Sequence, residues 1–170
     1  MVVPGRTVKD IEISNNSNSS EIFNELEKSG GFESRNIADG VDILSNMIQD
    51  EKCLKFLSFI GAIISTGFRG IIRDMIKKKW CDVVITTCGA LDHDIARHFS
   101  EYKEGSFTMD DKELADQKIH RLGNVLVPME SYGPLIEEKV QEILERAYNS
   151  GKKEMSTADI NRELGRAMGE

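Results

Sequence analysis

One stretch of the sequence concentrates side chains that can bind a cation or move a proton, Asp92-His93-Asp94. Two carboxylates beside an imidazole can hold an amine substrate or exchange protons near neutral pH. The same spacing also fits an ordinary helix start, in which Asp92 caps the helix, Asp94 favours its dipole and His93 is solvated. Spacing alone favours the helix start, and both interpretations stay open.

Cys88 lies in the same polar loop, where a helix N-terminus could stabilise a thiolate nucleophile. No particular histidine is placed as its base, so nucleophilic catalysis is the weaker interpretation. The chain has three cysteines and no CxxC pair, which argues against a disulfide framework and a structural zinc site. His98 and His120 have no carboxylate partners at a converging spacing, so the sequence predicts no metal site.

The loops that carry these residues follow two predicted strands. Cys53–Ile60 and Asp82–Thr86 are short apolar runs typical of strands covered on both faces. The segment between them predicts a helix, with an apolar stripe made by Phe68, Ile71, Ile72, Met75 and Ile76. This order predicts a βαβ unit with a parallel sheet.

Ligands of open α/β sheets bind outside the carboxyl ends of the strands, where the loops Ile60–Gly67 and Thr86–Asp94 lie. Neither loop contains GxGxxG, so a dinucleotide fingerprint is absent. Both loops offer glycines, hydroxyls and backbone N–H groups ahead of a helix, which are the ingredients of a phosphate cradle. Ordinary βα-turn chemistry explains isolated Gly/Thr/Ser loops at least as well.

The whole chain divides into three predicted segments. Residues 1–30 form an N-terminal extension, with an edge strand at Val8–Ile13 and a helix capped by Ser20. Residues 31–155 form the α/β domain, and residues 156–170 form a terminal helix opened by a capping box. The domain adds predicted helices from Asn36, from Asp110 or Asp111 to Ile119 and at Tyr132–Tyr148, and a third strand at Val125–Pro128. A sheet this small leaves an unpaired edge, which predicts an incomplete fold.

Composition narrows the class of protein. Hydrophobic residues make up 39% and charged residues 30%, which is a globular balance, and the formal net charge is −7. This acidic balance argues against a protein that coats nucleic acid or an anionic membrane. No apolar run reaches the roughly 18 residues that span a bilayer, and Met1–Ile11 lacks the form of a secretory signal. We therefore expect a soluble, cytoplasmic protein.

Residues 56–99 resemble the N-terminal half of deoxyhypusine synthases, especially the archaeal type, through the run FLSFIGAIISTGFRGIIRDMIKKKWCDVVITTCGALDHDIARHF. Residues 120–132, HRLGNVLVPMESY, are similar to the R-x-GN-x-LVP-x-E-x-Y stretch of that family. GGFESRNIADGVDIL at residues 30–44 and STADINRELGRAM at residues 156–168 also match in place. The resemblance extends in one collinear order from about residue 30 to residue 168.

This resemblance implies a Rossmann-like α/β fold, a parallel sheet flanked by helices, assembled into tetramers with shared active sites. It implies NAD-dependent transfer of the aminobutyl group of spermidine to a lysine of a translation initiation factor, through an imine on an enzyme lysine. It places Asp92 and His93 at the spermidine site, although eukaryotic relatives have glutamate at both positions. It assigns NAD contacts to two loops, made by Gly61, Ala62, Ser65 and Thr66 and by Thr87, Cys88 and Gly89. Ala62 replaces a polar residue of eukaryotic relatives.

The family subunit is about twice as long as this chain, and its second half carries the nucleophilic lysine beside a tryptophan. Trp80 is the single tryptophan of this sequence and does not fit that motif, so no catalytic lysine is expected here. The main hypothesis is an N-terminal component that needs a complementary C-terminal half and is inactive and self-associating alone. A non-catalytic regulatory partner of a full-length homologue is the alternative, and a degenerate gene fragment is the third.

Overall fold

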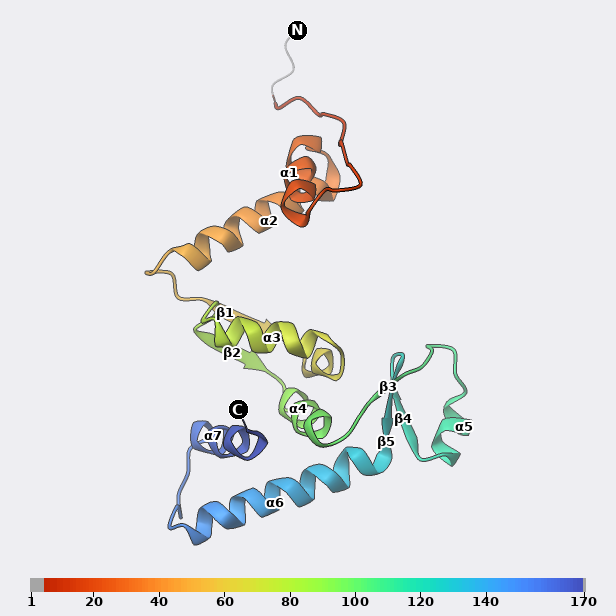
Figure 1. Cartoon of the computed structure of the whole chain (residues 1–170), viewed down its shortest axis with the longest axis vertical. Coiled ribbons are helices and arrows are strands. Elements are labelled where there is room, and N and C mark those ends of the chain that lie inside the picture. Colours follow the sequence, from red (N-terminus) through yellow and green to blue (C-terminus); the bar gives the residue numbers. More distant parts are fainter. Residues whose placement is uncertain (1–4, 170) are drawn as a thin grey trace. The chain divides into compact units, whose positions relative to one another are not determined.

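The computed structural model describes residues 5–169 (Figure 1). Residues 1–4 of the expected N-terminal extension, and Glu170 of the expected terminal helix, lie outside the described residues. The chain divides into two compact units. The first holds the residues up to Lys55 together with Trp80–Val83, and the second holds Phe56–Lys79 and the residues from Val84 onward.

The first unit contains two consecutive helices, α1 (Ser19–Ser29) and α2 (Phe32–Gln49). Asn18 caps α1: its side chain accepts from the Glu21 N–H at 3.1 Å, and the Glu21 carboxylate accepts from the Asn18 N–H at 3.0 Å. The expected cap at Ser20 is therefore wrong, because the reciprocal capping box needs the glutamate three residues after the cap. The second helix also begins before the expected Asn36.

The expected edge strand at Val8–Ile13 is wrong, since no residue of that segment is in a strand. Val8 and Ile13 are both about two-thirds exposed. Alternation of apolar and polar residues predicts a strand only where a neighbouring strand can accept its backbone hydrogen bonds. Here the Glu12 N–H donates to the side chain of Glu25 in α1 instead.

All of the predicted βαβ connection except Trp80–Val83 belongs to the second unit. Strands β1 (Phe56–Phe59) and β2 (Val83–Thr86) pair in a two-stranded parallel sheet, joined through the 3-10 turn η1 (Gly61–Ser65) and helix α3 (Phe68–Lys77). The expectation that both faces of these strands are covered is wrong in this chain. Phe56 of β1 is 58% exposed and Ile85 of β2 is 55% exposed.

Helix α4 (Gly89–Phe99) leads from β2 into a separate sheet of strands β3 (Lys103–Glu104), β4 (Ile119–Leu122) and β5 (Val125–Pro128), with α5 (Asp111–Asp116) before β4. The spatial order is β3-β5-β4, and both pairings are antiparallel. The expected third parallel strand is therefore a strand, but it joins a different sheet. Gly123, at φ 64°, and Asn124 form the two-residue turn that sets Leu122 opposite Val125.

The C-terminal helices close a small core around α4. The 3-10 turn η2 (Met129–Ser131) leads into α6 (Gly133–Asn149) and then α7 (Thr157–Met168). Buried side chains from α4, α6 and α7 meet in one cluster, made by Ile95, Ile143 and Leu164. The amphipathic helix and the capping box of Ser156 with Asp159 are confirmed. This packing fixes α4, which carries the candidate site.

None of the helices within residues 5–169 combines the length and the apolar character that crossing a lipid bilayer requires.

Candidate functional site

Two βα loops converge at Gly61, directly after β1. Its backbone N–H donates to the Thr87 Oγ1 at 3.0 Å, which ties the start of η1 to the loop after β2. A Cβ at position 61 would lie 2.3 Å from the Ala90 nitrogen and 2.7 Å from the carbonyl carbon of Gly89. Glycine is required because a side chain would collide with backbone atoms. The two predicted loops are therefore brought into contact.

The hydroxyls of the first loop are used locally. Ser65 is buried, and its Oγ donates to the Ala62 carbonyl at 2.7 Å. Thr66 Oγ1 donates to the Ile63 carbonyl at 2.7 Å and accepts from the Phe68 N–H at 3.2 Å. Both side chains hold the 3-10 turn, and they keep only oxygen lone pairs for a ligand.

The second loop ends at the N-terminus of α4. Cys88 is exposed and occupies the N-cap position, with no side-chain cap hydrogen bond. Helix α4 therefore begins at Gly89, and the interpretation in which Asp92 caps the helix is wrong. The N–H groups of a first helical turn have no partner within the helix and attract anions. The loop combines an exposed thiol with such a turn.

One ion pair and two further hydrogen bonds hold α4 in place. Arg97 donates from Nη1 to the Ile64 carbonyl at 2.9 Å and to the Thr66 carbonyl at 2.5 Å. Asp94 pairs with Arg69 of α3. Asp94 therefore helps to hold α4 against α3 through its ion pair with Arg69. Asp92 is the carboxylate of this stretch that remains for other contacts.

Asp92 and His93 each contact a tyrosine that is distant in sequence. Tyr132 donates from its hydroxyl to Asp92 Oδ2 at 3.2 Å, and the Tyr102 hydroxyl lies 3.0 Å from His93 Nδ1. The His93 ring also meets the Tyr102 ring edge-on, with centroids 5.8 Å apart, and the Tyr132 ring at 5.1 Å. His93 is only 9% exposed, so the interpretation in which it is solvated at an ordinary helix start is wrong.

Burial sets the protonation of this cluster. It lowers the pKa of His93 most strongly, while the charge of Asp92 raises that pKa and Arg97 lowers it. Burial raises the pKa of Tyr102 to about 12 and raises the pKa of Tyr132, to which Asp92 also contributes. At neutral pH the imidazole is neutral and both phenols keep their protons.

The sequence offered little signal for the contacts of these two tyrosines. They lie nine residues after His93 and 40 residues after Asp92, so neither shares a helix turn with the residue it contacts. Tyr132 ends the motif stretch at residues 120–132, which is the one hint in the sequence. Within the described part of the chain, no three His, Cys, Asp or Glu side chains form a group that could hold a metal ion.

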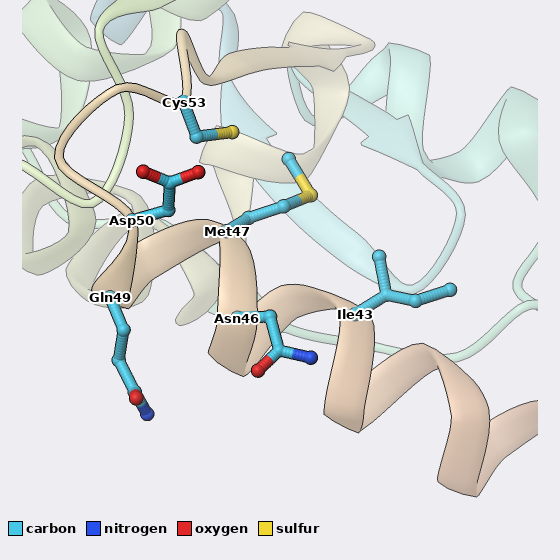
Figure 2. Close-up of a pocket in the computed structure, with 6 residues that line it drawn as sticks. All are labelled: Ile43, Asn46, Met47, Gln49, Asp50 and Cys53. Carbon is cyan, nitrogen blue, oxygen red and sulfur yellow. The ribbon is translucent and has the colours of Figure 1, made fainter.

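A surface hollow also lies in the first unit. It has a volume of about 560 Å³ at the end of α2 and the turn after it, and Figure 2 shows the six residues that line it. Gln49 points away from Cys53 in that view, and the lining holds one carboxylate, that of Asp50. This arrangement offers no acid–base pair, so the converging loops of the second unit remain the better candidate.

Comparison with known proteins gives a consistent result. A family model described as deoxyhypusine synthase matches residues 21–170. A protein of Thermoplasma volcanium named probable deoxyhypusine synthase is 49% identical over 160 residues, which are 94% of this chain and 51% of that protein. A protein of Picrophilus torridus with the same name is 48% identical over 159 residues, which are 94% of this chain and 50% of that protein. The chain spans about half the length of these curated relatives.

Solved structures show a likeness in fold. The crystal structure of a proposed deoxyhypusine synthase from Entamoeba histolytica superposes with a TM-score of 0.55 at 18% sequence identity. The match covers 96% of this chain and 57% of that chain.

Proposed function

Because the chain belongs to the deoxyhypusine synthase family, we propose that it is the N-terminal component of an enzyme that transfers the aminobutyl group of spermidine to a lysine of a translation initiation factor. The observation that carries this proposal is the convergence of the two βα loops at Gly61 and Thr87, in a chain that spans half of its relatives. The component holds the cofactor and part of the polyamine, and a second half completes the active site.

The converging loops fit a dinucleotide. The close approach at Gly61 leaves the first turn of α4 next to the start of η1, so backbone N–H groups of Cys88 and Gly89 can meet phosphate oxygens. Thr87 lies at the same junction, where Ala62 follows Gly61. The remaining lone pair of Thr66 Oγ1 can accept from a ribose hydroxyl, while the buried Ser65 supports the turn. NAD bound here supplies the oxidant for spermidine.

Asp92 supports polyamine binding. A carboxylate attracts the ammonium groups of spermidine, and the net charge of −7 reinforces that attraction at a distance. His93 is neutral, so it adds a hydrogen-bonding group without opposing the polycation. Asp94 is already paired with Arg69 and contributes less.

The nucleophilic lysine belongs to the region of the relatives that this chain does not span. Trp80 lies at the end of a lysine run and does not form the lysine–tryptophan motif of the family. We infer that the second half supplies this lysine and the remaining contacts, in an assembly of facing subunits of the kind that the family forms. The isolated chain then binds NAD weakly and transfers nothing.

Reconstitution tests this function. The chain is co-expressed with the C-terminal half of the Thermoplasma volcanium relative, and the pair is incubated with NAD, labelled spermidine and the archaeal translation initiation factor. Label is expected on one lysine of the factor with both halves and not with either half alone. The measurement is the label that remains with the factor after acid precipitation.

The controls separate the outcomes. Omitting NAD must abolish the label. Transfer by the chain alone would overturn the need for a second half. A stable complex that transfers no label, while the chain modulates a full-length homologue, would support the regulatory alternative instead.

A further inference from the structure

We propose that Tyr102 and Tyr132 are positioning residues of this site: Tyr102 holds His93 neutral with its proton on Nε2, and Tyr132 fixes one oxygen of Asp92. This inference rests on the proposed function for its consequence, the binding of a polycation. The arrangement of the four side chains does not depend on that function.

Hydrogen-bond donors decide the form of His93. The Tyr102 phenol keeps its proton, because its pKa is raised to about 12. The Tyr102 hydroxyl lies 3.0 Å from His93 Nδ1, within hydrogen-bonding distance. When Tyr102 donates, Nδ1 must be the acceptor, and the single proton of the neutral imidazole lies on Nε2. Protonation of Nδ1 would remove this acceptor.

The ionisable groups near His93 come from α4 and from the segments that follow it. Asp92 and Arg97 lie on α4 itself and act on the His93 pKa in opposite directions, and burial exceeds both. Tyr102 follows α4, and Tyr132 stands at the start of α6. The η1 segment, Gly61–Ser65, carries no ionisable side chain. The packing of η1 against α4 therefore adds no charge near this helix.

Tyr132 acts on the neighbouring carboxylate. Its hydroxyl donates to Asp92 Oδ2 at 3.2 Å, which leaves Oδ1 for another donor. The Tyr132 ring lies against the His93 ring, so one side chain contacts both functional residues. A carboxylate held by one donor loses less rotational freedom when it binds an ammonium group.

This arrangement predicts how pH affects polyamine binding. The folded state holds the pKa of His93 below its ordinary value of 6.5, so His93 stays neutral as pH falls to that value. Protonation at lower pH places a positive charge beside Asp92 and opposes the polycation. Loss of the Tyr102 donor removes a hydrogen bond that favours the neutral form, so His93 then protonates at a higher pH.

The first test measures His93 directly in the full chain. Exchange of the imidazole C2 proton for deuterium, followed against pH by mass spectrometry of peptides, gives a separate pKa for each histidine. Tyr102→Phe is expected to raise the His93 pKa by about half to one unit, the equivalent of one ordinary hydrogen bond. His98 and His120 serve as internal controls, and Tyr148→Phe, an exposed tyrosine on α6, is the matched variant.

An unchanged or lowered His93 pKa in Tyr102→Phe would overturn the proposal. A second measurement covers the case in which this variant does not fold. Nitrogen-15 spectra of the unsubstituted chain are expected to show a protonated Nε2 and a bare Nδ1. A proton on Nδ1 at neutral pH would equally overturn the role of Tyr102.

The reconstituted enzyme tests the consequence. The KM for spermidine is expected to rise as pH falls and His93 becomes protonated. In Tyr102→Phe this rise is expected to begin at a higher pH, by the same amount as the His93 pKa is raised. Tyr132→Phe is expected to raise that KM about three- to tenfold, and Tyr148→Phe to leave it unchanged. A KM profile that does not follow the His93 pKa contradicts the positioning role. If no transfer occurs in any sample, the proposed function fails, while the measurements on the chain still decide the state of His93.

Discussion

The two sheets of the molecule differ in how much of their apolar surface the chain itself covers. In the antiparallel sheet, β5 lies between β3 and β4, and Val127 is 3% exposed. In the parallel pair, neighbouring residues of β2 point to opposite faces, and Val84 and Ile85 are both exposed. The antiparallel sheet is closed by its own neighbours in sequence, whereas β2 of the parallel pair exposes apolar side chains on both of its faces.

The difference follows from how each sheet is connected. A two-residue turn joins β4 to β5, and Arg121 ties β4 to Asp111 of α5 through two hydrogen bonds of 2.6 and 2.8 Å. Short connections cost little chain entropy, so such a hairpin can form from adjacent sequence. Parallel strands need crossovers and layers on both faces, which come from distant sequence. The open pair therefore offers its apolar surface to a partner, which fits the proposed second half.

The largest expected effect comes from adding a charge to the open sheet. Ile85→Lys is expected to leave the chain folded and to abolish association with the C-terminal half, because the lysine would be buried without a partner. Phe107→Lys is the matched control, since Phe107 is 70% exposed beside the antiparallel sheet. Co-purification of the two halves measures the effect. Equal recovery with Ile85→Lys would break the comparison.

A smaller effect is expected from a single methyl group at two tight glycines. Gly61→Ala places Cβ against backbone atoms, whereas Gly105→Ala meets the side chains of Leu126 and Met109, which can move. We expect Gly61→Ala to lower the free energy of unfolding by about 3 kcal/mol and to remove NAD binding. Gly105→Ala is expected to cost about 1 kcal/mol. Urea unfolding and NAD titration of both variants measure this, and equal costs would contradict the role of the converging loops.

The smallest expected effect comes from removing methyl groups from one valine in each sheet. Val127→Ala removes buried methyl groups and is expected to cost about 2 kcal/mol in the isolated chain. Val84→Ala is expected to cost less than about 0.5 kcal/mol alone and more once the second half is bound. Unfolding of each variant, with and without the second half, checks this. A Val84→Ala cost that does not change on assembly would show that β2 stays uncovered.

The sequence predicted the positions of helices and strands better than it predicted which of them pack or pair together. The βαβ order, the long α6 and the Ser156 capping box depend on residues close together in sequence, and all were predicted. The prediction of a strand at Val8–Ile13 was wrong, because alternating apolar and polar residues do not show which other strand it would pair with. Gly123-Asn124 between two apolar runs is a local hairpin signal, so the turn that joins β4 to β5 can be predicted from the sequence.

The candidate site divides in the same way. The two loops and the pair Asp92-His93 could be picked out because sequence order places them after strands and at a helix start. The burial of His93, the pairing of Asp94 with Arg69 and the contacts of both tyrosines could not be predicted. Each depends on a contact between segments that no local pattern links.

The sequence by itself determined the family, the strand–helix–strand order of the βαβ unit, and the residue types that the loops after β1 and β2 can offer to a nucleotide. The tertiary structure alone decided that Gly61 has no room for a side chain and that two distant tyrosines meet Asp92 and His93. Local patterns fix backbone conformation through hydrogen bonds and side-chain spacing within a few residues. Packing between distant segments sets burial, and burial sets which protons the site keeps.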